Sequence, residues 1–542
     1  VSGLGDVYKR QGQVNAITAL SPVNGTGTFT DIMASQIDTA FIIITHTSLM
    51  TEAGDYANYR SNLVAGNNPQ NAIVFDIEEL YDQFAFGIRK HPNAIRGFAD
   101  FVVDNWTSTP HYLFLLGKSI KAKLSRGSGV DFANNLVPSF GVPASDNMLT
   151  SGLNGTIREP LIPTGRLSAK SGAEVTIYLD KITDHENPQL PNGTASTDWM
   201  KRVLHFGGGT STNEAAGFLQ NLNNYKSTIE DTLFGANVVT FSKSSTAPIQ
   251  NILSDSIKDY IGQGVAIMTF FGHASATGGF DQNIDNPANW PNQNGRYPML
   301  FGLSCFAGDI HGVDGNSTSE EHVIIQDQGV IGFLSSVDLG LSTFLHYYAE
   351  EFYHQLSYKN YKGAIGNHIK NTIIQEQSGY YAQETAASVT LHGDPSLKLN
   401  TFDLPDYMIE APTVTFSPSI VTSDLDSFDV NVLVTNLGMA VNDSIVLELV
   451  RDFPNQQFTD TIYTKEFPGT KNQDLYTFTL PVDLIRGLGV NNFTITIDAI
   501  NNVAESFENN NVVSKSLEIL SGEIIPIWPY EFMIVPNQGI TL

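Results

Sequence analysis

Short apolar runs alternate with segments of helical periodicity along residues 39–400 of the chain. A short apolar run bounded by turn residues is typical of a buried strand, and apolar residues spaced three and four apart are typical of a helix. The sequence therefore predicts strands at residues 41–45, 72–76, 112–117, 161–166, 202–206, 237–241, 265–271, 299–303 and 330–334. It predicts helices at residues 53–64, 77–86, 94–103, 173–187, 214–225, 250–262, 343–356 and 364–377. Strands that alternate with helices at this spacing indicate a parallel α/β sheet.

Two changes of pattern divide the chain into domains. A segment rich in proline and asparagine at 187–197 separates two consecutive α/β subdomains, which we place at 39–195 and 196–404. Residues 412–520 alternate between apolar and polar positions in short runs separated by Asn, Asp and Gly, which predicts an immunoglobulin-like β-sandwich. Residues 1–38 are interpreted as an N-terminal remnant, of which 1–11 resemble a cloning junction, and 521–542 as the truncated start of a further segment.

Charge excludes some classes of partner. Aspartate and glutamate outnumber lysine and arginine by 56 to 29, which gives a formal net charge of −27. This balance argues against nucleic acid and against an anionic membrane surface, and it fits an exported protein. No apolar run reaches the roughly 18 residues that a membrane-spanning helix needs, so we expect no membrane span.

Two of the predicted strands end in reactive side chains. His273 follows the run at 265–271, and Cys305 follows the run at 299–303. Because chemistry collects at the carboxyl ends of parallel strands, neighbouring strands of this kind would hold an imidazole and a thiol on one edge. The pair would form a cysteine nucleophile with its acid/base partner. Cys305 is the only cysteine, so it forms no internal disulfide, and the competing interpretation is a buried structural thiol.

Several motifs, taken in order, resemble those of the gingipain-type cysteine peptidases, a family that includes the type IX secretion sortase. The first half carries FIIITHTSL, YLFLLG and PTGRLSAKS, and the second carries FFGHAS, LSCFAGDI, GVIGFLSS and LHGDPSLKL. The resemblance covers about residues 39–400. It implies a caspase-like α/β fold and hydrolysis or transfer at a peptide bond. The β-sandwich that follows resembles adhesion-related domains of exported bacterial proteins.

The resemblance also assigns roles to residues. The Cys305 thiolate would attack the scissile carbonyl, His273 would protonate the leaving amine, and backbone N–H groups around Gly272, Ala274 and Cys305 would hold the oxyanion. The family usually has glycine directly after the catalytic histidine, where this chain has Ala274. It also places a glutamate after the strand at 202–206, where this chain has glycines at 207–209 and Glu214 is the nearest carboxylate.

Other candidates remain open at this point. Glu214 would orient His273, line the pocket, or occupy the first turn of a helix, where the dipole favours a carboxylate. Asp309 would support the loop of Cys305, line the pocket, or lie in a turn. The family suggests a structural calcium loop at Asp146, although we expect a solvated loop there, and no other cofactor is predicted. His392 is expected to pack beside the sheet.

We therefore predict a secreted or cell-surface bacterial cysteine endopeptidase that acts on proteins or peptides through a thioester. One alternative is a sortase-like transpeptidase with secretion-system components as partners. The other is a non-catalytic adhesion protein in which the α/β unit has lost its chemistry.

Overall fold

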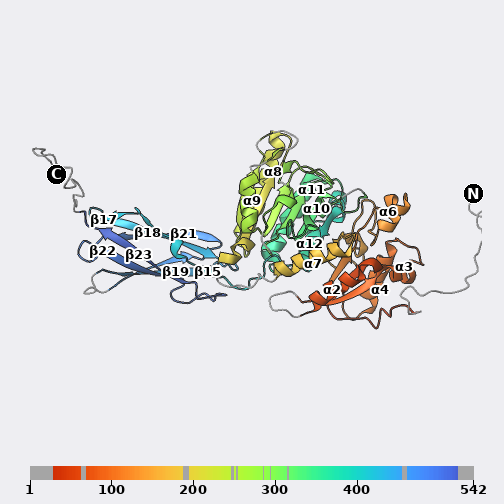
Figure 1. The fold of residues 1–542 in the computed structure, drawn as a ribbon, viewed down its shortest axis with the longest axis horizontal. Coiled ribbons are helices and arrows are strands. Elements are labelled where there is room, and N and C mark those ends of the chain that lie inside the picture. The colour runs from red at the N-terminus through yellow and green to blue at the C-terminus, as the bar shows by residue number, and fades with distance from the viewer. Residues whose placement is uncertain are drawn as a thin grey trace, which may run out of the picture.

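The computed structural model describes residues 28–62, 69–186, 195–243, 245, 250–251, 254–284, 286–292, 295–313, 316–454 and 460–522. An α/β body is followed along the chain by a β-sandwich, and the two lie end to end (Figure 1). The predicted fold class, α/β structure followed by a strand-rich C-terminal region, is confirmed.

One ten-stranded sheet runs through the α/β body. Its spatial order is β2 (Asn71–Asp76), β1 (Ala40–Thr45), β3 (Tyr112–Leu116), β4 (Thr164–Leu167), β14 (Val389–His392), β13 (Gly332–Ser336), β12 (Met299–Leu303), β8 (Ile267–Phe271), β5 (Arg202–Gly207) and β6 (Asn237–Ser242). Neighbouring strands are parallel except β13 and β14, which are antiparallel. The first five strands in this order therefore run in one direction and the last five in the other.

The two predicted α/β subdomains are thus joined in one mixed sheet. Strand β14 comes from the end of the second subdomain, and it pairs in parallel with β4 of the first through His392 and Arg166. His392 was expected to pack beside the sheet, but it lies in the sheet itself and is 1% exposed. The carboxyl ends of β8 and β12 still share one edge, because the two strands are adjacent and parallel.

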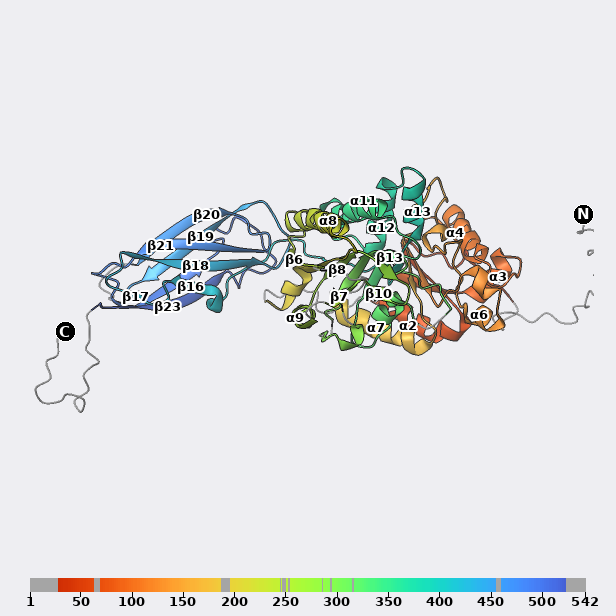
Figure 2. The ribbon, with the colours of Figure 1, turned by 90° about the horizontal axis from the view of Figure 1, so that it is seen from above.

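Helices cover both faces of the sheet. The longer ones are α2 (Met50–Ser61), α3 (Ile77–Phe84), α4 (Asn93–Asn105), α7 (Gly172–Glu186), α8 (Thr212–Glu230), α9 (Ser254–Gln263), α11 (Ser342–His354), α12 (Ile365–Gln375) and α13 (Tyr380–Ser388). Short helices are α5 (Ala122–Ser125), α6 (Gly129–Asn134) and α10 (Thr318–Val323). Figure 2 shows α8, α11 and α12 on one side of the sheet and α7 and α9 on the other.

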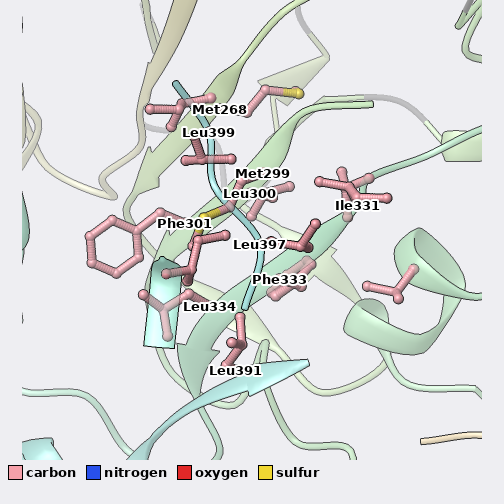
Figure 3. Packing of buried hydrophobic residues seen from close by; sticks show 14 of the residues in the cluster. Met268, Met299, Leu300, Phe301, Ile331, Phe333, Leu334, Leu391, Leu397 and Leu399 are labelled. Carbon is pink, nitrogen blue, oxygen red and sulfur yellow. The ribbon is translucent and has the colours of Figure 1, made fainter. Parts of the chain in front are cut away.

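Strands β8, β12 and β13 are buried along their whole length. Figure 3 shows Met268 of β8, Phe301 of β12 and Leu334 of β13 in one packed cluster. Parallel strands that are covered on both faces have continuous apolar sequences, and for this reason these strands could be predicted from the sequence. Close packing of this kind leaves little freedom to the strands that carry His273 and Cys305.

A buried ion-pair network joins the two halves of the body away from that edge. Arg60 of α2 lies 2.7 Å from Asp394, directly after β14, and 2.7 Å from Glu186 at the end of α7. The Tyr56 hydroxyl also donates to Asp394, 2.5 Å away. Asp394 is fully buried, so the cation of Arg60 is what makes its charge tolerable in the interior.

The β-sandwich consists of two sheets over a shared apolar core. Its strands are β15 (Tyr407–Met408), β16 (Val414–Ser417), β17 (Val421–Thr422), β18 (Ser427–Asn436), β19 (Ser444–Asp452), β20 (Thr461–Pro468), β21 (Gln473–Pro481), β22 (Gly489–Thr496) and β23 (Val512–Leu520). In β19, buried residues alternate with more exposed ones, as the period-2 pattern predicted.

The sandwich is docked onto the α/β body through Lys201, which is 1% exposed. Its ammonium group donates to three backbone carbonyls of the sandwich, those of Asn436 (3.0 Å), Gly438 (2.8 Å) and Lys471 (2.7 Å). Burial lowers the pKa of Lys201 to about 7. Its hydrogen bonds connect the two domains, together with one from the Ala440 N–H to the Leu233 carbonyl at 2.9 Å. In the part of the chain that the structure describes, no helix has the length and apolar character needed to span a membrane.

Candidate active site

Cys305 and His273 emerge from neighbouring strands at one edge of the sheet. Strands β12 and β8 are parallel and hydrogen-bonded, with Leu303 opposite Phe271. Each reactive residue stands two positions beyond the end of its strand. The side chain of His273 is 47% exposed, and Cys305 is half-buried. The thiol is therefore not enclosed in the core, as a purely structural cysteine would be.

A tight turn follows the thiol. Phe306 has a φ of 58°, in the left-handed region that residues other than glycine rarely adopt. Its N–H donates to the carbonyl of Asp338 in the loop after β13, 3.0 Å away. In that same loop the Gly340 N–H lies 3.4 Å from the sulfur of Cys305, and the Gly340 carbonyl lies 3.7 Å from it. The loops after β12 and β13 together fix the position of the sulfur.

Glu214 lies beside His273, although 59 residues separate them in the sequence. The Glu214 Oε1 and His273 Nε2 atoms are 3.0 Å apart. Glu214 sits in the first turn of α8, where its own N–H donates to Ser211 Oγ and its Oε2 accepts from the Thr210 N–H. Of the three roles that the sequence left open, the contacts fit two, because the helix start that favours a carboxylate also brings it to the imidazole.

The charge of Glu214 follows from its contacts. Partial burial alone would raise its pKa, but hydrogen bonds from Thr210 and His273 outweigh that effect and lower the pKa from its ordinary value. The carboxylate is therefore ionised at neutral pH and accepts a hydrogen bond from His273 Nε2. In this tautomer Nδ1 of the neutral ring carries the free lone pair.

Of the backbone N–H groups that were expected to hold the oxyanion, Gly272 and Ala274 differ in whether the sheet already uses their hydrogen bond. The Gly272 N–H donates to the Leu303 carbonyl at 3.3 Å, so it is already used to join β8 and β12. Ala274 opens β9 (Ala274–Ser275), which pairs with β10 (Gly279–Phe280). The Asp281 N–H donates to the His273 carbonyl, which makes Ala274 and Phe280 a non-hydrogen-bonded pair. The Ala274 N–H therefore points away from β10, whereas that of Gly272 is committed to the sheet.

Asp309 does not approach His273 through any contact of its carboxylate. Its Oδ2 lies 2.6 Å from Lys121 Nζ, and its Oδ1 accepts from the His311 N–H at 3.2 Å. The backbone N–H of Asp309 donates to Phe306, in the turn after the thiol. Of the roles considered for Asp309, these contacts fit the support of the loop that carries Cys305.

The expectation of a solvated loop at Asp146 is wrong. Asp146 is 3% exposed, and its two oxygens accept from Arg166 Nε (2.7 Å) and Nη2 (2.8 Å). Arg166 holds the pKa of Asp146 below its usual value in spite of burial, which on its own would raise it. Among the described residues, no group of three or more His, Cys, Asp or Glu side chains could hold a metal ion. The structural calcium that the resemblance suggests stays a prediction.

Comparison with known proteins decides the family. The profile of peptidase family C25 matches residues 34–400. The chain belongs to this family of cysteine peptidases. No curated protein sequence matches the chain.

Two solved structures share the fold. The complex of the Porphyromonas gingivalis RgpB pro- and mature domains has a TM-score of 0.53 at 15% identity, covering 88% of this chain and 99% of that one. The Arg-specific cysteine proteinase gingipain R has a TM-score of 0.50 at 14% identity, covering 89% of this chain and 98% of that one. At these identities the likeness concerns the fold, so the caspase-like α/β prediction is confirmed.

Glu214 can be tested against a matched residue. Glu174 occupies the same position in the first turn of α7, where its Oε2 accepts from the Lys170 N–H at 2.6 Å and its N–H donates to Ser171 Oγ at 3.4 Å. We expect Glu214→Gln to lower kcat/KM for peptide cleavage roughly 10²-fold, because a neutral amide does not stabilise the imidazolium. Glu174→Gln removes an equivalent helix contact and should leave kcat/KM within about twofold. Equal losses in both variants would show that Glu214 acts only through the helix.

Proposed function

We propose that this protein is a cysteine endopeptidase in which Cys305 is the nucleophile and His273 the acid and base. The observation that carries the proposal is that the two residues follow paired strands on one edge, with Glu214 hydrogen-bonded to the imidazole. A free cysteine titrates near 8.5, so a thiolate at neutral pH needs a neighbouring cation. An imidazolium held by the ionised Glu214 supplies that cation.

The chemistry proceeds in two stages. In the first, the thiol proton passes to His273, the Cys305 sulfur attacks the scissile carbonyl, and the tetrahedral oxyanion collapses with cleavage of the C–N bond. His273 gives its proton to the leaving amine, and a thioester remains on Cys305. In the second, water loses a proton to His273 and attacks the thioester, which releases the carboxylic acid and restores the thiol. The Ala274 N–H supports the oxyanion in both stages.

The exposure of the site fits a polymeric substrate. The imidazole is about half exposed, and both reactive groups stand at the open edge of the sheet, so an extended peptide can reach them without a free chain end. We propose that the protein acts outside the cell or on its outer surface. The strongly acidic composition and the family that it belongs to support this location.

The test is a cleavage survey with the full chain. A mixture of peptides is incubated with the protein before and after alkylation by iodoacetamide, and the products are sequenced by mass spectrometry. We expect internal cleavage that disappears when one label is found on Cys305. The proposal would be overturned if the protein cleaved no peptide and Cys305 stayed unlabelled under conditions that alkylate a free peptide thiol. That result would favour an adhesion protein. An added amine that appears at the new carboxyl ends would instead identify a transpeptidase.

A further inference from the structure

Asp281 lies behind the histidine and was not singled out by any sequence motif. It follows β10 in the short hairpin that begins at His273, and it is 6% exposed. Its backbone N–H donates to the His273 carbonyl at 2.8 Å, so the end of the hairpin lies directly beside its first residue, His273. A buried carboxylate at this position needs partners, since an unpaired charge in the interior is costly.

The two oxygens of Asp281 contact three segments, those that follow β8, β5 and β6. Oδ1 accepts from the backbone N–H of His273 at 3.2 Å. Oδ2 accepts from the backbone N–H of Gly209 at 2.8 Å, and it lies 3.4 Å from Nζ of Lys243, whose side chain is fully buried. Hydrogen bonds to a charged acceptor are about twice as strong as neutral ones. One side chain thus joins the ends of β5, β6 and β8.

The segments after β8 and β5 carry His273 and Glu214, the two partners of the imidazole–carboxylate pair. The first contains His273 itself. The second runs from Gly209 into Thr210, whose N–H and hydroxyl both donate to Glu214 Oε2, and into Ser211, which caps α8. The distance of 3.0 Å between Glu214 and His273 therefore depends on two backbone segments that Asp281 holds together from the buried side.

The glycines around Asp281 make room for its carboxylate. A Cβ atom on Gly208 would lie 2.2 Å from Asp281 Oδ1, and one on Gly272 would lie 2.7 Å from the same oxygen. Real Cβ atoms do not approach an oxygen so closely, so either substitution would displace the carboxylate. This contact explains Gly208 in the glycine run at 207–209, which departs from the family pattern. Gly209 has a different reason, because its φ is 124° and a Cβ atom there would lie 2.8 Å from the Ala215 nitrogen.

We propose that Asp281 is a positioning residue of the active site, which sets the distance between Glu214 and His273 through their backbones. The role rests on the proposed function, because it gives His273 the acid/base task. A carboxylate that only stabilised the fold would change the melting temperature without changing the reactivity of the thiol. A positioning carboxylate changes both, since a small displacement of the imidazole weakens its support of the Cys305 thiolate.

The test compares Asp281→Asn with Asp146→Asn in the full chain. Both replace a buried aspartate that is paired with a cation, but Asp146 bonds Arg166 in the other half of the sheet. The rate of Cys305 alkylation by iodoacetamide is measured against pH, with kcat and KM for a cleaved peptide as a second readout.

We expect Asp281→Asn to lower the alkylation rate at neutral pH about tenfold and to move the pH profile toward that of a free thiol near 8.5. We expect kcat to fall by up to ~10²-fold with little change in KM, and Asp146→Asn to keep the wild-type profile.

The alkylation profiles distinguish a failure of the proposed function from a failure of the positioning role of Asp281. If His273→Ala and wild type share one profile, the thiol has no histidine partner and the proposed function is wrong. If His273→Ala shifts the profile and Asp281→Asn does not, only the positioning role is wrong. Should Asp281→Asn fail to fold, hydrogen exchange on the wild-type chain decides. The amides of His273 and Gly209 should exchange slowly, and rapid exchange at either would overturn the proposal.

Discussion

Replacing Cys305 by alanine is expected to lower kcat/KM for peptide cleavage by at least ~10⁴-fold, because no covalent intermediate can form without the sulfur. The residual activity would come from the binding surface and the oxyanion donors alone, which in other hydrolases give rates of only ~10³–10⁴-fold over water. The measurement is the initial rate of peptide hydrolysis at concentrations well below KM, with active-site titration of the wild type.

The control for this variant is its stability. Cys305 is half-buried, and within the described residues its sulfur makes two weak hydrogen-bond contacts, both with Gly340, so the alanine variant should melt within a few degrees of the wild type. A well-folded Cys305→Ala protein that keeps more than about one hundredth of the wild-type rate would place the nucleophile elsewhere. The same protein should take up no iodoacetamide label, because Cys305 is the only cysteine in the chain.

The second large effect concerns stability rather than catalysis. We expect Arg60→Met to lower the free energy of unfolding by about 3–5 kcal/mol, because it leaves buried charges without a cation. Asp394 is 0% exposed, and the side chain of Glu186 is 6% exposed, so water cannot replace the guanidinium at either carboxylate. Urea denaturation of the full chain, followed by circular dichroism, measures the loss.

A surface arginine provides the comparison. Arg89 lies 3.2 Å from Glu78, but its side chain is 69% exposed. Arg89→Met should cost no more than about 1 kcal/mol, since exposed ion pairs contribute little. If the two variants lost similar amounts, the network between α2, α7 and the turn after β14 would add no more stability than an exposed ion pair.

The strands were predictable where burial was complete. The run at 299–303 was predicted with the bounds that β12 has, and the run at 202–206 differs from β5 by one residue. Strand β14 was missed, because VTLH is short, carries two polar residues and leads into a turn. Periodicity within a segment does not encode which distant strand will pair with it. For this reason the antiparallel junction of β13 and β14, and the single mixed sheet, could not be read from the sequence.

The positions of the two main candidate residues were also predictable from the buried strands. His273 and Cys305 each follow an apolar run, so the rule about carboxyl ends was enough to bring them together. The partnership of Glu214 with His273 needed the fold, because a glutamate in the first turn of a helix has a sufficient local reason to be there. Asp281 gave no signal at all, since its partners are two backbone N–H groups, which every sequence contains, and a lysine 38 residues away in the chain.

A solitary, half-buried sulfur also bears on how such an enzyme survives oxidation. Within these 542 residues there is no second cysteine to condense with a sulfenic acid and protect it as a disulfide. Further oxidation to the sulfinic acid is irreversible for most proteins. The working lifetime of this thiol should therefore be governed by small-molecule reductants in its surroundings, and the protein should lose activity steadily in aerated buffer and keep it when a free thiol is added.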